Sequence, residues 1–413
     1  MPDILPEDSA CMRWMEERSR EIFRLFGFSE IRTPLLEDTR VFTRSIGQDT
    51  DIVEKEMYSF TDRGGKSVSL RPEGTASVIR AYIENLASGG TELVKLFYSG
   101  PMFRGERPQK GRLRQFHQIG VEIIGGKNPF IDAELIMCLD ALLKNLGAGD
   151  FKIFINSIGC SGDRKAYTAK LKDYLSPLKE ELCENCRRRV QSNVLRVLDC
   201  KRPRCRNTVK GAPAITDNLC KDCLDGYSTL KNILYASGIP FDEKPDLVRG
   251  LDYYTGTIFE VMHPGLGAQD AVAAGGRYDD LTADMGGPDT GATGFALGVE
   301  RLMLIMDRSA VDLPSADAVV IPVDEALRAD AFRLMVKFRR RGIACEMDHT
   351  GRSLKAQMRK ANKEGRRFVA LLGEDEARKG KVLIKDMSES AQRELAADEA
   401  IEFIKEALSV KDG

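Results

Sequence analysis

The chain contains little histidine and carries almost no net charge. It has three histidines among 413 residues, and its 62 basic residues are balanced by 63 acidic ones, giving a formal net charge of −1. Bulk charge therefore does not predict a binder of polyanions, and any surface for nucleic acid must be local. The length predicts two or three domains, each with room for a hydrophobic core.

The sequence also lacks the segments that direct a protein into or across a membrane. No apolar run approaches the roughly 18 residues of a spanning helix. Residues 1–8 have neither the basic nor the apolar region of a signal peptide. We therefore expect a cytoplasmic protein with no membrane partner. Ten cysteines in such a chain indicate reduced thiols or metal ligands rather than disulfides.

The glycine motifs that commonly bind nucleotides are absent as well. Residues 64–67 (Gly-Gly-Lys-Ser) end like a P-loop, but Phe60 stands where that motif requires a glycine. We interpret residues 62–65 as a hairpin turn. The sequence contains no Gly-x-Gly-x-x-Gly. If the chain uses ATP, arginines must therefore hold the phosphates.

The cysteines are concentrated in one polar, basic segment. Six of the ten cysteines lie in this segment, namely Cys183, Cys186, Cys200, Cys205, Cys220 and Cys223. The spacing includes two Cys-x-x-Cys pairs separated by a long loop, which is typical of tetrahedral Zn²⁺ sites. Cys200 and Cys205 either replace one pair or are spare, and the alternative to a metal is a set of small buried thiols. A zinc ion here would be structural, because the segment lies away from the other motifs.

Residues 102–122 form the most informative stretch, which reads as a strand, an exposed basic loop and a second strand. In the second strand, period-two alternation gives an apolar face, namely His117, Ile119, Val121 and Ile123. The opposite face carries Phe116, Gln118, Gly120 and Glu122. Arg104 and Glu106 share a face of the strand before it. The polar groups would converge on one surface suited to a small polar ligand, a phosphate and the end of a nucleic acid. The alternative is a hairpin with one solvated face.

The rest of the chain predicts two sheet-containing regions. Helices are expected at 8–26, capped by Asp8 or Ser9 and ended by Gly27, and at 76–87. Strands are expected at 28–34, 67–71 and 151–156, with sheet returning at 246–262 and 270–282 after a helical, cysteine-rich insertion at 163–240. Residues 291–308 read as a glycine-rich strand followed by an apolar helix, and residues 313–316 as a linker.

The last hundred residues alternate strand and helix, which predicts a separate α/β domain. Strands are expected at 318–323, 343–347, 367–372 and 381–386, and helices at 325–341, 352–364 and 396–409. Arg352, Lys355, Arg359 and Lys363 recur near the helical period and make one basic face. In a chain of balanced charge this face predicts contact with a phosphate backbone, the alternative being an ordinary solvated helix face.

Several of these strings resemble known motifs. Phe103-Arg104-x-Glu106, a loop, Arg112 and Phe116 resemble motif 2 of the class II aminoacyl-tRNA synthetases, and the fuller string from Arg104 to Gln118 resembles the histidyl-tRNA synthetase family. Residues 249–254 (Arg-Gly-Leu-Asp-Tyr-Tyr) and 274–279 (Ala-Gly-Gly-Arg-Tyr-Asp) resemble two signatures of that family. Gly298-Val-Glu300-Arg301 resembles motif 3, and the helix and strand ending at Pro34 resemble motif 1, the dimer interface.

This resemblance implies a fold and an activity. The expected fold is an α+β catalytic domain with the antiparallel class II synthetase sheet over residues 1–312, including the insertion, plus an α/β anticodon-binding domain over 316–413. The expected protein is a homodimer that activates L-histidine with ATP and Mg²⁺ and transfers histidine to the 3′ end of tRNA(His). The reacting carboxylate is already ionised at neutral pH, so no general base is required and scarce histidine is no objection.

The resemblance also assigns residues. Arg104 and Arg249 flank the α-phosphate as catalytic groups, and Arg301, with Glu106, binds the nucleotide. The histidine pocket comprises Glu73, Gly74, Thr75, Arg104, Gln118, Glu122, Arg249, Tyr253 and Tyr254. Within it Glu122 and Tyr254 face the imidazole ring, whereas Glu73, Thr75 and Gln118 surround the α-amino group. The alternative for residues 73–75 is helix capping by Thr75 with Glu73 solvated. From their position in the exposed loop alone, Arg107 and Gln109 are expected to contact the tRNA acceptor end.

Two rivals remain at this point. The first is the synthetase-like regulatory subunit of ATP phosphoribosyltransferase, which typically lacks the C-terminal domain and the intact histidine signatures. The second is a class II synthetase for another amino acid with the same C-terminal domain, such as the threonyl, prolyl or glycyl enzyme. The chain begins almost directly at residues 3–6 (Asp-Ile-Leu-Pro), where relatives usually carry a longer segment, so we expect that an N-terminal strand is missing.

Overall fold

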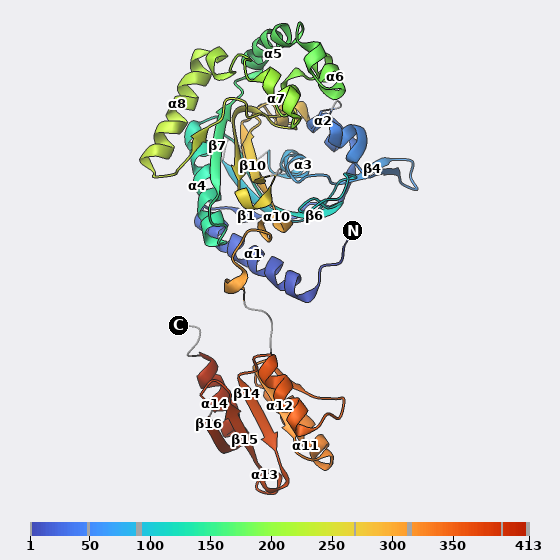
Figure 1. Ribbon diagram of the computed structural model, residues 1–413, viewed down its shortest axis with the longest axis vertical. Coiled ribbons are helices and arrows are strands. Elements are labelled where there is room, and N and C mark those ends of the chain that lie inside the picture. Colours follow the sequence, from blue (N-terminus) through green and yellow to red (C-terminus); the bar gives the residue numbers. More distant parts are fainter. Residues whose placement is uncertain are drawn as a thin grey trace. The chain divides into compact units, whose positions relative to one another are not determined.

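The chain folds into two compact units, residues 1–311 and 312–413, each described here by itself. A computed structural model describes residues 2–47, 50–87, 93–267, 270–311, 316–389 and 391–409 (Figure 1). The expected linker at 313–316 lies almost wholly outside these residues. Within the described ranges, no helix is long and apolar enough to cross a membrane.

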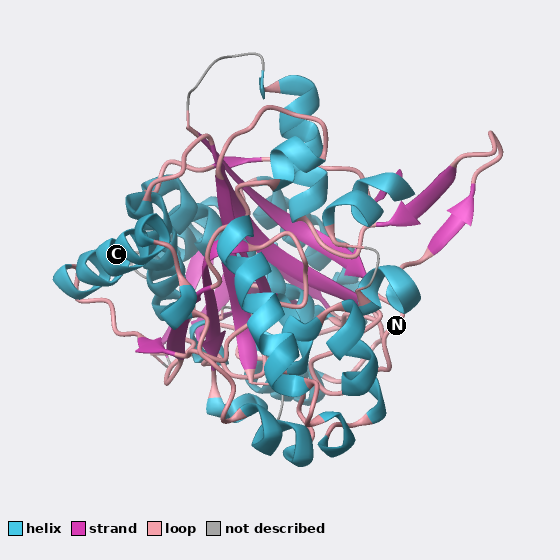
Figure 2. Ribbon diagram, turned by 90° about the horizontal axis from the view of Figure 1, so that it is seen from above, coloured by secondary structure: helices cyan, strands magenta, loops and turns pink. Residues whose placement is uncertain are grey.

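An eight-stranded sheet forms the centre of the first unit. Its strand order is β1-β5-β6-β11-β10-β9-β7-β8. The strands are β1 (Ser29–Glu30), β5 (Val94–Phe103), β6 (Gln115–Ile124), β7 (Lys152–Ser157), β8 (Asp242–Glu243), β9 (Thr255–Met262), β10 (Ala271–Arg277) and β11 (Ala292–Gly298). Neighbouring strands from β5 to β7 pair antiparallel, and only the short edge strands β1 and β8 pair parallel. Figure 2 shows these strands running through the unit with helices on both sides.

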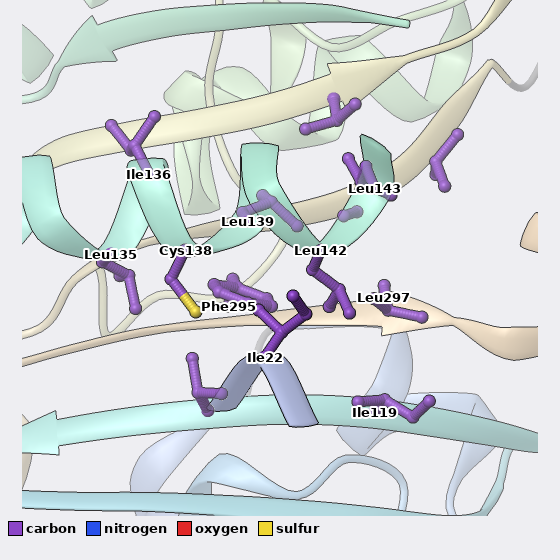
Figure 3. Close-up of a cluster of buried hydrophobic side chains, with 14 of the residues drawn as sticks. Ile22, Ile119, Leu135, Ile136, Cys138, Leu139, Leu142, Leu143, Phe295 and Leu297 are labelled. Carbon is purple, nitrogen blue, oxygen red and sulfur yellow. The ribbon is translucent and has the colours of Figure 1, made fainter. Parts of the chain in front are cut away.

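One face of this sheet is covered by helices and forms the main hydrophobic core. The covering helices are α1 (Pro6–Leu25), α4 (Pro129–Asn145) and α8 (Lys221–Ala236). Figure 3 shows Leu139 and Leu142 of α4 packed over Phe295 and Leu297 of β11, with Ile119 of β6 beneath them. Each fully buried side chain of this kind contributes about 1.5–3 kcal/mol. The apolar face predicted for the strand at 115–124 is confirmed, since Ile119, Val121 and Ile123 are buried in this core.

The opposite face of the sheet is left open for a site. Helix α3 (Thr75–Asn85) lies over part of it, together with the short helices α2 (Thr39–Ser45) and α9 (Leu281–Asp284). The short helix α10 (Val299–Leu302) follows β11 and buries Val299 and Leu302 in the main core. A small sheet of β2 (Leu36–Asp38), β4 (Ser67–Leu70) and β3 (Ser59–Thr61) projects beside them (Figure 1). Residues 62–65 form the predicted hairpin turn, because Asp62 Oδ1 accepts hydrogen bonds from the backbone N–H groups of Gly64 and Lys66.

The insertion is a cluster of short helices that leaves the sheet after β7 and returns to it before β8. It contains α5 (Ser161–Leu175), α6 (Glu184–Ser192), α7 (Pro203–Val209) and α8, with short 3-10 turns between them. Its interior includes Tyr167, Leu171, Val190 and Cys205. Helix α8 then packs against α4, which anchors the end of the insertion on the helical layer of the sheet.

The second unit is a five-stranded sheet with helices, in the order β13-β12-β14-β15-β16. The strands are β12 (Ala318–Pro322), β13 (Cys345–Met347), β14 (Phe368–Leu372), β15 (Lys381–Asp386) and β16 (Ala391–Ala396). The helices are α11 (Arg328–Arg340), α12 (Leu354–Lys363), α13 (Glu374–Arg378) and α14 (Ala397–Ser409). The first three strands pair parallel, as expected for α/β units, whereas β15 and β16 add antiparallel edges.

Some local predictions are wrong. Helix α1 begins at Pro6, earlier than the predicted caps, because proline is well tolerated in the first helical turn. The strand predicted at 28–34 is only two residues long. The helix expected within 291–308 ends after four residues, at Leu302. Strand β16 was not predicted, since its exposed, charged residues do not alternate as a buried strand does.

Candidate functional site

A cavity of about 970 Å³ lies in the first unit between the open face of the sheet and the insertion. The insertion lines it with residues that include Arg196, Leu198 and Asp199. The predicted site residues that line it are Glu73, Thr75, Arg104, Glu106, Gln118, Arg249, Tyr253, Tyr254 and Arg301. Four segments far apart in the sequence therefore supply one site.

One end of the cavity holds a buried carboxylate network. Glu73 accepts hydrogen bonds from the backbone N–H groups of Thr75 and Ala76, at 2.7 and 2.8 Å, and so caps helix α3. The Thr75 hydroxyl donates instead to Glu122 Oε1 at 2.8 Å. The alternative in which Thr75 caps the helix and Glu73 is solvated is wrong, because Glu73 is buried and does the capping itself.

This end is strongly desolvated. Burial raises the pKa of Glu122 well above its ordinary value, and the nearby Glu73 carboxylate adds to the rise. Burial also raises the pKa of Glu73, against the hydrogen bonds that it accepts from the helix. Glu122 Oε2 and Gln118 Oε1 are both buried with no hydrogen-bond partner in the described part of the chain. Buried acceptors are costly when unpaired, so these two oxygens favour a ligand that donates hydrogen bonds.

Glycines on the sheet make room for this network. Tyr98 pairs with Gly120 across β5 and β6, and a Cβ at Gly120 would overlap the Tyr98 hydroxyl. Glu122 pairs with Gly294 of β11, where a Cβ would overlap Glu122 Oε2 and the Tyr278 hydroxyl. We did not predict roles for Tyr98 and Tyr278. Side chains alternate between the two faces of a strand, so counting back in twos from Arg104 would have placed Tyr98 on the face that meets the ligand.

Three tyrosines form an aromatic wall beside the carboxylates. The ring centroids of Tyr253 and Tyr254 are 4.7 Å apart, and Tyr278 meets them nearly edge-on at 5.4 and 6.0 Å. Tyr253 and Tyr254 precede β9, and both line the cavity.

Two of the predicted arginines lie half-buried at the cavity wall. Arg249 Nη1 donates to Glu260 Oε1 at 3.0 Å, and its guanidinium stacks over the Tyr254 ring at 5.5 Å. Burial works against its charge, but Tyr254 and Glu260 outweigh it, so the pKa of Arg249 rises. Arg104 Nε donates to the Pro72 carbonyl at 2.9 Å, and burial lowers its pKa. Both are held in place by neighbours, as preorganised anion binders must be.

Arg301 and Glu106 complete this basic end. Arg301 lies on α10 beside Gly111 of the loop that joins β5 and β6. Burial, with the nearby charge of Arg112, lowers the pKa of Arg301. Arg112 forms an ion pair with Glu106 at 3.2 Å. The cavity thus brings the acceptors Glu73 and Gln118 together with the guanidinium groups of Arg104, Arg249 and Arg301.

Two residues in the informative motifs have structural roles. His117 Nδ1 and its backbone N–H both contact the carboxylate of Glu300, at 2.8 and 2.9 Å, which fixes β6 against α10. Arg277 is buried in an ion pair with Asp132 of α4 at 2.7 Å and also pairs with Asp279. His117 therefore joins β6 to α10 and does not line the cavity.

The residues predicted to contact tRNA are exposed. Arg107 and Gln109 lie in the β5–β6 loop and do not line the cavity. On the second unit, Arg352 precedes α12, and Lys355 and Arg359 lie on it. All three are exposed and form no ion pair with any described residue. By contrast, Arg366 is buried and already paired with Glu346.

The cysteines form two separate clusters, so the prediction of one site built from both Cys-x-x-Cys pairs is wrong. Cys183, Cys186, Cys200 and Cys205 make the first cluster, and Cys220 and Cys223 join Cys160 and Asp163 in the second. In each cluster the ligand atoms all lie within 4.8 Å of one another. Cys200 and Cys205 thus replace one pair, the option left open. All ten cysteines are free of disulfides.

The chain was compared with known proteins. A family model described as histidyl-tRNA synthetase matches residues 1–302, and one described as an anticodon binding domain matches residues 317–407. A histidine–tRNA ligase of Syntrophomonas wolfei is 47% identical, covering 99% of this chain and 98% of the relative. One of Geobacter sulfurreducens is 47% identical, covering 95% of each.

A solved structure agrees. The crystal structure of apo S. aureus histidyl-tRNA synthetase matches with a TM-score of 0.81 at 35% identity, covering 98% of both chains. The predicted family, fold class and ligase activity are confirmed. The chain belongs to the histidyl-tRNA synthetase family of class II aminoacyl-tRNA synthetases, whose reaction is the aminoacylation of tRNA(His).

Proposed function

We propose that the cavity carries out both steps of the histidine–tRNA ligase reaction, with L-histidine bound at its carboxylate end and the phosphates of ATP at its arginine end. The observation that carries this proposal is that buried hydrogen-bond acceptors and guanidinium groups share one cavity. Glu73 and Gln118 line it together with Arg104, Arg249 and Arg301, and Glu122 lies behind this lining, hydrogen-bonded to Thr75. A zwitterionic amino acid needs acceptors for its ammonium group, and the phosphates of ATP need cationic groups.

The carboxylate end suits histidine. The α-ammonium group of the substrate is a donor for Glu73, the Thr75 hydroxyl oxygen and Gln118, close to the backbone of Gly74. An imidazole ring N–H donates to the unpaired Glu122 Oε2, with Tyr254 as the flat wall. A side chain without that donor would leave Glu122 buried and unpaired, which is the basis of selectivity.

The arginine end performs the first step. A carboxylate oxygen of histidine bonds to the α-phosphorus of ATP, and the bond to the bridging oxygen breaks as pyrophosphate leaves with the electron pair. Arg104 and Arg249 stabilise the charge that gathers on the α-phosphate, and Arg301 and Glu106 hold the nucleotide. Mg²⁺ accompanies ATP as part of the substrate. Tyr253 lines the same region and closes its apolar side.

In the second step a hydroxyl oxygen of the terminal ribose of tRNA(His) bonds to the carbonyl carbon of histidyl-adenylate, and the bond from that carbon to the phosphate oxygen breaks as AMP leaves. Arg107 and Gln109 lie on the exposed β5–β6 loop, so they are placed to meet the acceptor end. Arg352, Lys355 and Arg359 are exposed, form no ion pair within the described part of the chain, and suit the backbone of the anticodon arm. We assign the reaction to the cytoplasm, where ATP and tRNA are available.

The chain is proposed to act as a homodimer through residues 28–36. Arg71 is buried and donates to the carbonyl and the hydroxyl of Thr33, which fixes this segment. Leu35 and Leu36, which follow Pro34, are apolar and exposed by 42% and 46%. A dimer contact here would remove them from water. Light scattering on the purified protein would give twice the chain mass of 45.9 kDa, and a monomer would contradict the assignment.

The first cysteine cluster is proposed to hold a structural Zn²⁺. Cys183 Sγ and Cys200 Sγ are 4.0 Å apart, close to the edge of about 3.8 Å that four Zn–S bonds of about 2.3 Å give in a tetrahedron. This metal would fix α6 and the turn after it, whose Arg189 and Arg196 pair with Asp51 at 3.1 and 2.7 Å. It would thereby hold the insertion over the cavity.

The direct test of the histidine pocket is Glu122→Gln. The amide keeps the shape but loses the charged acceptor, so we expect KM for histidine to rise about tenfold to a hundredfold, with KM for ATP nearly unchanged. Exposed Glu17→Gln on α1 is the matched control. An unchanged KM for histidine in Glu122→Gln would remove Glu122 from the pocket.

A further inference from the structure

The second cysteine cluster lies where the insertion begins and ends. Cys160 and Asp163 belong to the first turn of α5, immediately after β7, and Cys220 and Cys223 to the first turn of α8. Figure 1 shows both helices at the insertion end of the catalytic unit. The two turns are nearly sixty residues apart in the chain, yet their ligand atoms lie within 4.8 Å of one another.

The two turns share one local design. Cys160 and Cys220 are the N-cap residues of α5 and α8, and Asp163 and Cys223 stand three residues later. The N-cap and third helical positions lie on the same side of a first turn, which is the geometry that also brings capping-box side chains together. Each turn therefore presents two ligand atoms in one direction, and the two turns face each other.

The donor set suits a divalent cation. Asp163 is buried at 7% exposure, and its Oδ1 accepts from the backbone N–H of Cys220 at 3.0 Å. Its Oδ2 is buried with no partner at hydrogen-bond geometry in the described ranges, the thiols of Cys220 and Cys223 lie beside the carboxylate, and Asp163 pairs with no described basic residue. A buried carboxylate beside three thiols is costly without a cation. Three thiolates and one carboxylate match tetrahedral zinc.

The cluster is connected to the histidine end of the cavity. Arg164, the next residue after Asp163, donates from Nη1 to the carbonyls of Asp252 and Tyr254 at 2.9 and 2.8 Å. The loop before Cys160 is pinned to the same place, since the backbone N–H of Gly256 donates to the Gly159 carbonyl at 2.7 Å. A Cβ at Gly159 would overlap Asp163, so the close approach requires glycine there.

We propose that Cys160, Asp163, Cys220 and Cys223 bind a second zinc ion, which clamps the two ends of the insertion together and, through Arg164, holds Tyr254 in position for histidine. Asp163 and the cysteines act as metal ligands, and Arg164 is a positioning residue. The part concerning histidine rests on the pocket proposed above, whereas metal binding does not.

The stoichiometry of the metal tests the site. Protein produced with added zinc is expected to carry two zinc ions per chain by elemental analysis. Cys160→Ser and Cys220→Ser each remove one ligand while placing serine, a good capping residue, at the N-cap. Each is expected to carry one zinc. Cys183→Ser, the N-cap cysteine of α6 in the first cluster, is the matched variant and retains the zinc of the second cluster. Cys345→Ser, in the other unit, keeps both.

Cobalt gives an independent readout for any variant that folds poorly. Wild-type protein loaded with Co²⁺ is expected to show thiolate-to-cobalt absorption from two sites, and Cys183→Ser should retain the part due to the second cluster. A wild-type stoichiometry of one zinc, unaffected by Cys160→Ser, would overturn the proposal. So would iron in place of zinc at this cluster.

The link to histidine is tested separately. Cys160→Ser is expected to raise KM for histidine about tenfold, a change of about 1.4 kcal/mol, with a smaller effect on KM for ATP. Arg164→Met should raise it similarly while keeping two zinc ions. If Cys160→Ser loses its zinc but keeps a wild-type KM for histidine, the positioning role is wrong and the metal site stands. If wild type shows no histidine-dependent activity, the pocket assignment fails, whereas the zinc count remains a valid test of the site.

Discussion

Removing the guanidinium of Arg249 should nearly abolish histidyl-adenylate formation while the protein still folds and dimerises. Arg249 is proposed to flank the α-phosphate, and it is held in position by Glu260 at 3.0 Å and by the Tyr254 ring. Its Nε is buried and has no hydrogen-bond partner in the described part of the chain, so it is available to a ligand. Loss of one preorganised donor of this kind costs about 2.7–4 kcal/mol, or about 10²–10³ in rate.

The same substitution has a cost in stability that must be separated from its effect on catalysis. The Arg249 and Glu260 side chains are only 17% and 16% exposed, so Arg249→Ala leaves a largely buried carboxylate without its partner. Breaking a buried pair costs about 3–5 kcal/mol, and the remaining exposure favours the lower end of that range. The double variant Arg249→Ala/Glu260→Gln removes the orphaned charge and should recover much of this loss.

The assay is histidine-dependent exchange of pyrophosphate into ATP, with thermal unfolding measured on the same samples. We expect both variants to lose exchange, but only the single variant to lose much stability. Arg249→Lys keeps the charge without the two-pronged geometry and should fall between wild type and alanine. A stable double variant that exchanges within about tenfold of wild type, less than 1.4 kcal/mol of barrier, would refute the role of Arg249.

Three further predictions follow from burial and charge. Burial raises the pKa of Glu122 in the folded state. The contribution of its protonated carboxyl to the stability of the fold is therefore fully present below the unfolded-state pKa of about 4.3, and it is lost as the pH rises through the folded-state pKa. Glu122→Gln should therefore raise the melting temperature of histidine-free protein at pH 8, by an amount that shrinks towards pH 4.5, and a pH-independent difference would contradict this. Gly294→Ala would press a methyl group on Glu122 and the Tyr278 hydroxyl. It should therefore lower the free energy of unfolding in urea by about 1–3 kcal/mol and raise KM for histidine. An unchanged unfolding free energy and KM would show that the sheet shifts to accommodate the methyl group. Arg352→Glu/Arg359→Glu should lower the aminoacylation rate, by a factor that shrinks with added salt because salt weakens the wild-type phosphate contacts more, and leave exchange intact; equal loss of both activities would argue against tRNA contact.

Short sequence motifs predicted most of the residues on the face of the sheet that meets the ligand. Alternation along residues 115–124 separates Gln118 and Glu122 from the apolar core residues, and the structure keeps that separation. Strand alternation succeeds because a slip of one residue would bury every polar side chain and expose every apolar one. The family resemblance supplied the remaining members, such as Arg249 and Arg301, which no local pattern distinguishes from surface arginines.

Partnerships between distant segments were not predictable in the same way. Glu73 and Thr75 were placed correctly at a helix start, but which of them caps the helix depends on Glu122, which lies on another strand. The role of Tyr98 depends on its pairing with Gly120. Neither dependence is visible in the spacing of one segment.

The grouping of the cysteines also depends on partnerships between distant segments. Spacing identifies Cys183-x-x-Cys186 and Cys220-x-x-Cys223 as ligand pairs but does not say which pairs share an ion. The return of α8 to the sheet beside the end of β7 brings Cys220 to Cys160, and this depends on the packing of α8 against α4. Asp163 was not considered because a single acidic residue in a helix is ordinarily solvated.

The most direct measurement is ATP–pyrophosphate exchange by the purified wild-type protein, with each common amino acid supplied in turn. The account predicts exchange with histidine alone, because only an imidazole donor satisfies Glu122 while the arginines bind ATP. Exchange with a different amino acid, or with none, would contradict the assignment of this cavity as a histidine-activating site.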